Sequence, residues 1–313
     1  MPGIVEQLMN HRRFHWLEKI QVELATLVAL AAVYFLVWPH LRPDDPEGPV
    51  TFVSVGGYGH LAAFAVIVWV LAAAAAVVTI HSRPEGAMLA AFIGAGGVSL
   101  HSPSVRPLLW LWQDRLAGLY GRLILEVLLL AVVLAVAAGI VLLVRRMIAA
   151  IRPGWIWRSP VGAAAAPAQS GSGRRRGNRD LLARSIACLL LGMLIAVVLL
   201  LLLMRSGDRG QALFALLMSF VVGVMVAHQV FPSPYSVVAW TMPVATAIVF
   251  YVLFALSSMS GSSNAWTRVP FYAYALPIDW MTVGAGGALL GFWISQRIHE
   301  IRHFEKLEDG KGT

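Results

Sequence analysis

Charged residues are scarce in this sequence. They make up 13% of the 313 residues, whereas hydrophobic residues make up 58% and the mean hydropathy is +0.73. A soluble domain has about 25% charged and roughly 45–50% apolar residues. So few charges cannot cover a surface that faces water, which excludes an ordinary soluble enzyme, a disordered chain and a disulfide scaffold. We expect a polytopic membrane protein.

Cysteine and known catalytic motifs are also nearly or wholly missing. Cys188 is the single cysteine, which excludes an intrachain disulfide and a cysteine-based metal cluster. The sequence contains no Walker loop, no HExxH and no GxSxG. It therefore offers no catalytic residues and favours a non-enzymatic role.

Eight apolar segments are present, and each approaches the length of about 20 residues that a spanning helix needs. A backbone in lipid must satisfy its own hydrogen bonds, so the segments should be helices. We predict an all-α, polytopic transmembrane helical bundle of about eight spans. The segments cover about 20–38, 61–80, 86–102, 122–144, 182–204, 211–231, 236–258 and 278–297.

Lysine and arginine predict the orientation of the spans. With the N-terminus inside, 17 basic residues fall on the cytoplasmic side and 7 on the outer side. This asymmetry is the one that the positive-inside rule requires. We expect both termini in the cytoplasm and the protein in the cell membrane, as a multi-pass protein of a bacterial inner membrane.

A basic segment at 145–181 divides the chain into two predicted four-helix halves, 1–144 and 182–313, the second with a short charged tail. Its middle, AAAAPAQSGSG, is of low complexity, and arginines and tryptophans flank it. Such residues gather where headgroups meet the cytoplasm, so we predict lipid contacts and no binding of nucleic acid. The predicted interface residues are Arg145, Arg146, Trp155, Trp157, Arg174, Arg175 and Arg176.

Two competing alignments leave open whether the halves repeat one another. The fourth and eighth segments each have an acid near the outer end, a small-residue stretch and a basic inner exit, which favours a parallel repeat. Residues 86–104 also align with 210–236, which favours the inverted repeat found in transporters.

Two acidic residues are candidates for ion or proton coupling. Glu126 lies one turn inside an apolar segment, where an ionised carboxylate is costly and usually faces the bundle or a cavity. Arg122 is four residues earlier, so the alternative is a local Arg122–Glu126 pair. Asp279 follows Pro277 at the start of the last segment, where it either caps the helix or binds an ion.

Glycines at helical spacing predict close contacts between helices, within the chain or with a partner. Gly287 and Gly291 have the GxxxG spacing of packed membrane helices, and Gly284 lies on the same segment. Gly94 and Gly97 belong to a similar small-residue face on the third segment.

Four histidines at matching depths are candidate ligands of a haem. A b-type haem needs two histidines on facing helices, and the topology permits His60 with His101 and His81 with His228. All four lie at helix ends, where the alternative is an interface residue. We predict no cofactor as the main interpretation and haem b as an alternative.

One tryptophan-rich stretch resembles a known family signature. WLWQDRLAG, from Trp110 to Gly118, resembles the WGxxWxWDxR signature of haem-handling proteins of cytochrome c maturation. The glycine after the first tryptophan is missing and Gln113 is inserted before Asp114, so we transfer no function from the family.

Three functional hypotheses follow. The first is a non-enzymatic membrane subunit or scaffold that packs through its Gly/Ala faces against itself or other membrane subunits in the lipid bilayer. The second is a secondary transporter or proton-coupled permease that uses Glu126 and Asp279. The third is a haem-binding redox subunit.

Overall fold

The part of the chain that the computed structural model describes is helical. It comprises residues 2–42, 48–103, 105–152, 174–258 and 270–309, and no strand occurs among them. Six helices in these ranges are long and apolar enough to cross a membrane. They are Trp16–Leu41, Gly57–Val78, Gln113–Ile151, Asp180–Leu203, Arg209–Val230 and Val237–Ser258.

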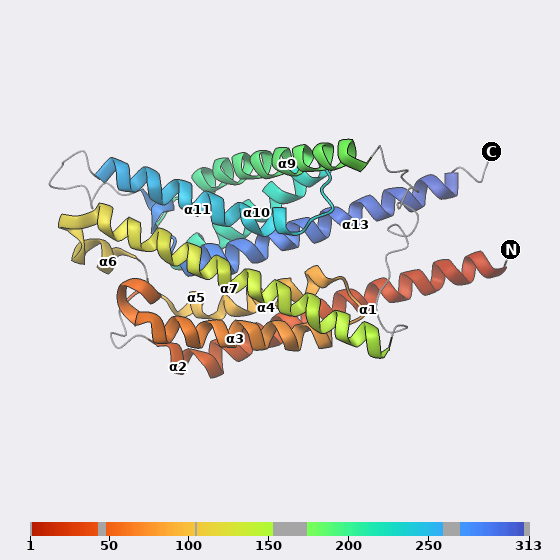
Figure 1. The fold of residues 1–313 in the computed structure, drawn as a ribbon, viewed down its shortest axis with the longest axis horizontal. Coiled ribbons are helices and arrows are strands. Elements are labelled where there is room, and N and C mark those ends of the chain that lie inside the picture. The colour runs from red at the N-terminus through yellow and green to blue at the C-terminus, as the bar shows by residue number, and fades with distance from the viewer. Residues whose placement is uncertain (1, 43–47, 104, 153–173, 259–269, 310–313) are drawn as a thin grey trace.

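The helices before residue 152 form one packed group, in which α1 contacts α4, and α3 contacts α4 and α7. Short helical pieces connect the long ones (Figure 1). The elements are α1 (Pro2–Ala32), η1 (Val33–Val37), α2 (Trp38–Leu41), η2 (Phe52–Gly56), α3 (Gly57–Val78), α4 (Pro84–Ala95), α5 (Gly97–His101), α6 (Arg106–Leu111), η3 (Gln113–Arg115) and α7 (Leu116–Ile151).

The helices after residue 173 form the second group, in which α10 contacts α9 and α13, and α11 contacts α9 and α13. The two groups meet where α7 packs against α11 and where α4 packs against α13. The elements are α9 (Arg174–Leu203), α10 (Arg209–Val230), α11 (Val237–Ser258), η5 (Phe271–Tyr274), α12 (Pro277–Asp279), η6 (Trp280–Gly284) and α13 (Ala285–Asp309).

Two of the eight predicted segments are not among the six long apolar helices. Segment 86–102 is divided at Gly96 into α4 of 12 residues and α5 of 5 residues. Segment 278–297 contains the π-helical turn η6 before α13. Helix α4 is apolar but too short to span alone because it ends at the Gly96 break, and the second half of α13 carries many charged residues.

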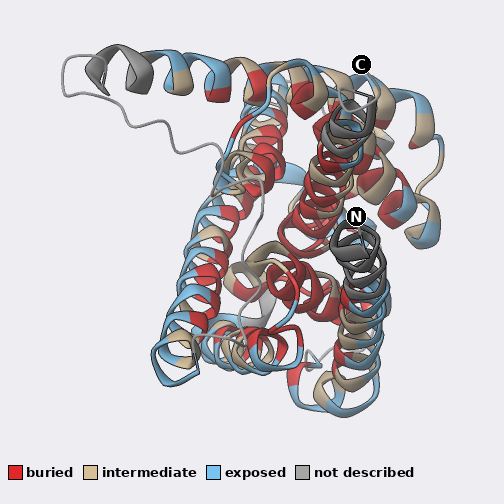
Figure 2. Ribbon diagram, turned by 90° about the vertical axis from the view of Figure 1, so that its right-hand side faces the viewer, coloured by how far each residue is buried: buried red, intermediate tan, exposed pale blue. Residues whose placement is uncertain are grey.

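Exposed apolar side chains cover the outward faces of the long helices. Leu24, Leu27 and Phe35 on the first span are exposed, as are Leu190 and Leu194 on α9. In the end-on view, buried residues occupy the inward faces and exposed ones the outward faces (Figure 2). Apolar faces of this extent are lipid contacts in a multi-pass membrane protein.

The glycines of the third segment lie against α1 and η1. A Cβ added at Gly94 would lie 2.5 Å from the Cβ of Ala29, and one added at Gly97 would lie 3.0 Å from the carbonyl oxygen of Leu30. Only a residue without a side chain permits this backbone separation.

The glycines of the last segment lie against α10 and α11, and the approach to α10 is the closer one. A Cβ at Gly287 would lie 2.6 Å from the carbonyl oxygen of Leu217, and one at Gly291 would overlap that of Val221. Gly284 faces Pro243 of α11, with 3.3 Å between the added Cβ and the proline Cβ. These small-residue faces therefore make contacts within the chain.

Both ends of the basic segment 145–181 are helical in the part of the chain that the structure describes. Helix α7 continues to Ile151, and α9 begins at Arg174. Helix α1 begins and α13 ends at the same end of the bundle (Figure 1).

Candidate functional site

Two interrupted helices meet where the two groups of helices pack together. A Cβ added at Gly96, between α4 and α5, would lie 3.2 Å from Cγ2 of Val283 in η6. Next to this contact, the hydroxyl groups of Ser99 and Thr282 lie 3.2 Å apart. Interrupted helices free backbone groups that can bind ligands, and π-turns are frequent at functional sites.

An ion pair lies beside these interruptions. Asp279 is fully buried, and both its oxygens accept hydrogen bonds from the guanidinium of Arg209, one of them 2.6 Å long. The backbone N–H of Leu276 donates to the same carboxylate at 2.7 Å. Arg209 also donates through Nε to the carbonyl oxygen of Ser99 at 3.1 Å. Asp279 thus has a full counter-charge and holds the first turn of α12.

Glu126 is the second buried carboxylate. Its exposed fraction is 0%, and its Oε2 accepts the N–H of Val53 in η2 at 3.2 Å. Free amides at a helix start favour a carboxylate. Its Oε1 has no hydrogen-bond partner among the described residues. Among the described residues, Glu126 therefore has a backbone contact and no counter-ion.

Unpartnered hydroxyl groups flank the residue that binds Glu126. Thr51 occupies the cap position of η2, yet its side chain makes no cap bond, and its buried Oγ1 has no partner in the described structure. The buried Oγ of Ser54, next to Val53, is in the same situation. Three oxygens around Val53 therefore have unused bonding capacity.

The local Arg122–Glu126 pair is not formed. Arg122 is exposed, and its guanidinium carbon lies 4.5 Å from the centre of the Trp112 ring. Helical spacing places the two residues on one side of α7, but each contacts a different neighbour. Arg122 lies over the Trp112 ring, and Glu126 binds the backbone of Val53. The sequence carried no signal for Val53, which is 73 residues away.

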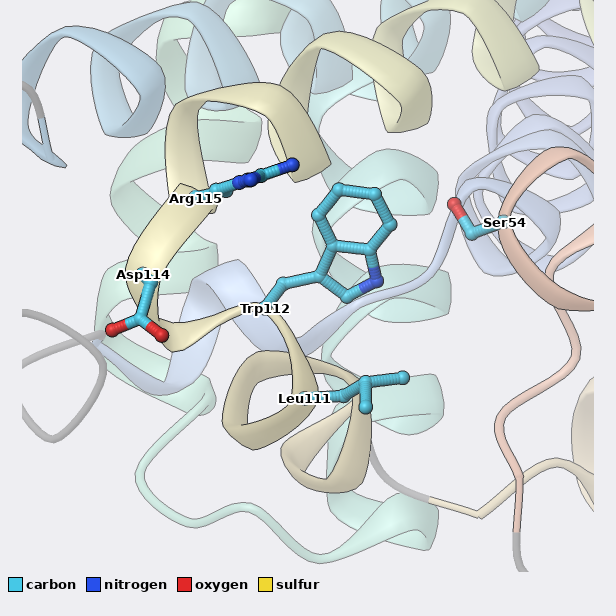
Figure 3. Close-up of a pocket in the computed structure, with 5 residues that line it drawn as sticks. All are labelled: Ser54, Leu111, Trp112, Asp114 and Arg115. Carbon is cyan, nitrogen blue, oxygen red and sulfur yellow. The ribbon is translucent and has the colours of Figure 1, made fainter.

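A surface pocket of about 380 Å³ reaches Ser54. Leu111, Trp112, Asp114 and Arg115 form the rest of its lining. Figure 3 shows the Trp112 indole and the Ser54 side chain on opposite sides, with Asp114 directed away from both. Ser54 adjoins Val53 in sequence, so one residue of the pocket lining is next to the residue that binds Glu126. Four of its residues, Leu111, Trp112, Asp114 and Arg115, belong to the tryptophan-rich stretch, for which the sequence predicted no site.

Aromatic side chains close the space between α7, α11 and η6. The ring centres of Tyr120 and Tyr251 lie 5.9 Å apart, and those of Phe250 and Trp280 also lie 5.9 Å apart. The hydroxyl of Tyr251 donates to the carbonyl oxygen of Ala275 at 2.6 Å. This packing shields the carboxylate region from the lipid side.

A charged cluster occupies the other end of the bundle. It comprises Glu18 of α1, Arg83 before α4, and Arg297 and Glu300 of α13. Arg297 binds Glu18 at 2.9 Å, and Arg83 binds Glu300. Arg83 also donates to the side chain of Gln296. Each of these contacts joins one group of helices to the other.

Burial changes the pKa values of Arg83, which belongs to this cluster, and of Glu85, two residues further along the chain. It lowers the pKa of Arg83, against the raising effect of Glu85 and Glu18. It raises the pKa of Glu85, against the lowering effect of hydrogen bonding to its own backbone and of the Arg83 charge. The cluster is therefore poorly hydrated.

Arg145 is not a lipid-interface residue. It is 7% exposed and donates to the carbonyl oxygens of Ser82 at 2.7 Å and Thr79 at 2.6 Å. These carbonyls follow the end of α3, where a helix leaves acceptors without partners. The interface prediction was wrong for Arg145 because α7 turns this side chain inward. Arg146, the next residue, is exposed.

The other predicted interface residues are only partly described. Arg174, Arg175 and Arg176 lie in the first turn of α9, and the placement of their side chains is not described. Trp155 and Trp157 lie outside the described residues.

The four candidate haem ligands lie in different settings. The ring nitrogens of His228 contact the Ser295 hydroxyl at 2.8 Å and the Ser233 carbonyl oxygen at 3.0 Å. His101 stacks on Trp38 with ring centres 4.6 Å apart. His60 lies in the first turn of α3, and His81 follows its end.

Within the described residues, no group of three or more His, Cys, Asp or Glu side chains is arranged to hold a metal ion. Comparison of the chain with family models, curated proteins and solved structures gave no match.

Proposed function

We propose that this multi-pass membrane protein is a proton-coupled secondary transporter in which Glu126 is the protonation site. The observation that carries the proposal is the buried Glu126 oxygen without a partner among the described residues. The Arg209 guanidinium pairs with Asp279, so it does not neutralise Glu126. A buried carboxylate without a counter-ion is costly, and it is neutralised by a proton or a cation.

The two acids have different roles in this proposal. Asp279 is bound by Arg209 and by a backbone amide, so it holds α12 and η6 in place. Glu126 has the free oxygen and lies next to Ser54, which lines the pocket. The pocket is the entry from the aqueous phase to Glu126, and solute binds at the interrupted helices around Gly96 and Thr282.

The proposed topology has eight passes with both termini in the cytoplasm, in a bacterial inner membrane. Helices α4–α5 and η6–α13 supply the two passes beyond the six long apolar helices. The shared end of α1 and α13 supports an even number of passes (Figure 1). A reporter fused at Gly171 should be cytoplasmic, and an outer location would contradict this topology.

The subunit hypothesis loses its main motivation. Its basis was the small-residue faces, and Gly94, Gly287 and Gly291 now have neighbours in α1 and α10. A partner helix would find these faces occupied.

The test is solute-driven proton uptake. Purified protein is reconstituted in vesicles that contain a pH-sensitive dye, and pools of amino acids, small carboxylates and sugars are added outside. We expect one pool to move protons with the wild type and with Glu23→Gln, which changes an exposed carboxylate on α1. We expect Glu126→Gln to lose this flux. Equal flux with Glu126→Gln, or no flux with any pool, would overturn the proposal.

A further inference from the structure

The charged cluster lies far from Glu126 and at the opposite end of the bundle. Arg145 contacts the turn that precedes Arg83, and it follows Glu126 by 19 positions on α7. At 1.5 Å per residue, that separation is about 28 Å along the helix. This is close to the roughly 30 Å thickness of a bilayer core. The cluster and Glu126 are therefore placed near the two sides of the membrane.

The cluster joins the two groups of helices through ion pairs, whereas the contact between α4 and α13 nearer the middle of the bundle is apolar. Below the cluster, Ile93 of α4 lies against Gly286 of α13, where an added Cβ would overlap the Ile93 side chain. Partly buried ion pairs add little stability compared with apolar packing, because both charges lose their hydration. Charges that separate can regain that hydration, whereas apolar surfaces cannot.

The helices that carry the cluster are the interrupted ones. Arg83 directly precedes α4, which ends at the Gly96 break, and Arg297 and Glu300 lie on α13, which follows η6. Breaks in helices are places where segments change direction in conformational switches. The parts of α4 and α13 between the breaks and the cluster can thus move apart as rigid pieces.

We propose that the charged cluster is a gate that closes the membrane side opposite the pocket, and that its opening exposes the α4–α13 interface to water. This inference rests on the proposed transport function, because a gate has a use only if solute passes. In the closed state described here, Glu126 communicates with the pocket side alone.

The test measures access to a cysteine behind the gate. Cys188→Ala removes the native thiol, and Leu89→Cys introduces one on α4, on the same helix face as Ile93 and four residues before it, at a position that is 4% exposed. Glu18→Arg replaces the Arg297 partner by a like charge, and adding Arg297→Glu restores an opposite pair. The reaction rate with a membrane-impermeant maleimide is measured in lipid nanodiscs.

We expect Glu18→Arg to raise the rate at position 89 about tenfold, which corresponds to about 1.4 kcal/mol in the open-state population. The double variant should return to the wild-type rate. Ala72→Cys is the control, because Ala72 is also buried but lies on α3, which packs within the first group. Its rate should stay low throughout.

Three outcomes would overturn the gate: no increase at position 89, an equal increase at position 72, or no recovery in the double variant. These readouts need no solute. If Glu126→Gln keeps its flux while access changes as expected, the protonation site is wrong and the gate remains. If access does not change, the gate is wrong and the flux assay of Glu126 is unaffected.

Discussion

Arg145 and Arg146 are neighbours in sequence with opposite surroundings, so they form a matched pair for a stability experiment. Arg145 is 7% exposed and donates two charged hydrogen bonds to carbonyl oxygens, whereas Arg146 is exposed. The perturbation is Arg145→Gln, compared with Arg146→Gln. Both remove one positive charge from α7, so only the contacts differ.

The magnitude follows from the two acceptors. The Thr79 carbonyl oxygen keeps bonds from the backbone and hydroxyl of Ser82 when Arg145 is replaced. The Ser82 carbonyl oxygen, in contrast, loses the bond from Arg145. A hydrogen bond to a charged group contributes about 1.5–3 kcal/mol. We therefore expect Arg145→Gln to lower the free energy of unfolding by about 2–4 kcal/mol.

An exposed residue such as Arg146 should change the free energy by less than about 0.5 kcal/mol. The assay is denaturant unfolding of the purified protein in detergent micelles, followed by tryptophan fluorescence. Equal losses for the two variants would refute the contacts assigned to Arg145, and so would a larger loss for Arg146→Gln.

Three further predictions concern other residues. Gly291→Ala should destabilise the protein by about 1–3 kcal/mol, because the added methyl group overlaps a carbonyl group of α10. The control Gly139→Ala should be neutral or slightly stabilising, because the space around Gly139 is open. Thermal unfolding compares the two variants. Asp279→Asn should cost about 3–5 kcal/mol because it leaves Arg209 without its counter-charge, and a smaller loss for the double variant with Arg209→Gln would identify the pair in a double-mutant cycle. Glu126→Gln should change stability by less than about 1 kcal/mol, since the amide oxygen still accepts the bond from η2; unfolding of the variant in the same micelles tests this, and a loss as large as that of Asp279→Asn would refute it.

The class of fold could be predicted because it follows from local properties. Runs such as 122–144 are apolar over a span's length, and the backbone in lipid has few alternatives to a helix. The glycine faces were also readable, because spacing places Gly287 and Gly291 on one side of a helix wherever it packs. The helices that contact these glycines could not be predicted, because a small-residue face predicts a close helix contact but does not identify the other helix.

The contacts of the charged side chains could not be predicted, because they depend on tertiary distance. Glu126 was expected to contact Arg122, four residues away, but it accepts a bond from Val53. Arg145 was expected at the lipid surface, but it binds Ser82, 63 residues earlier. In both cases a helix end supplied free backbone groups, and no side-chain pattern in the sequence indicates which distant residue will use them.

The central claim is that Glu126 gains and loses a proton inside the bundle. Infrared difference spectroscopy of the protein in lipid, recorded as a function of pH, detects the carbonyl band of a protonated carboxyl group directly. The account predicts a band whose intensity changes with pH in the wild type and in Glu23→Gln, and which is missing in Glu126→Gln. An identical set of pH-dependent bands in Glu126→Gln and the wild type would contradict it.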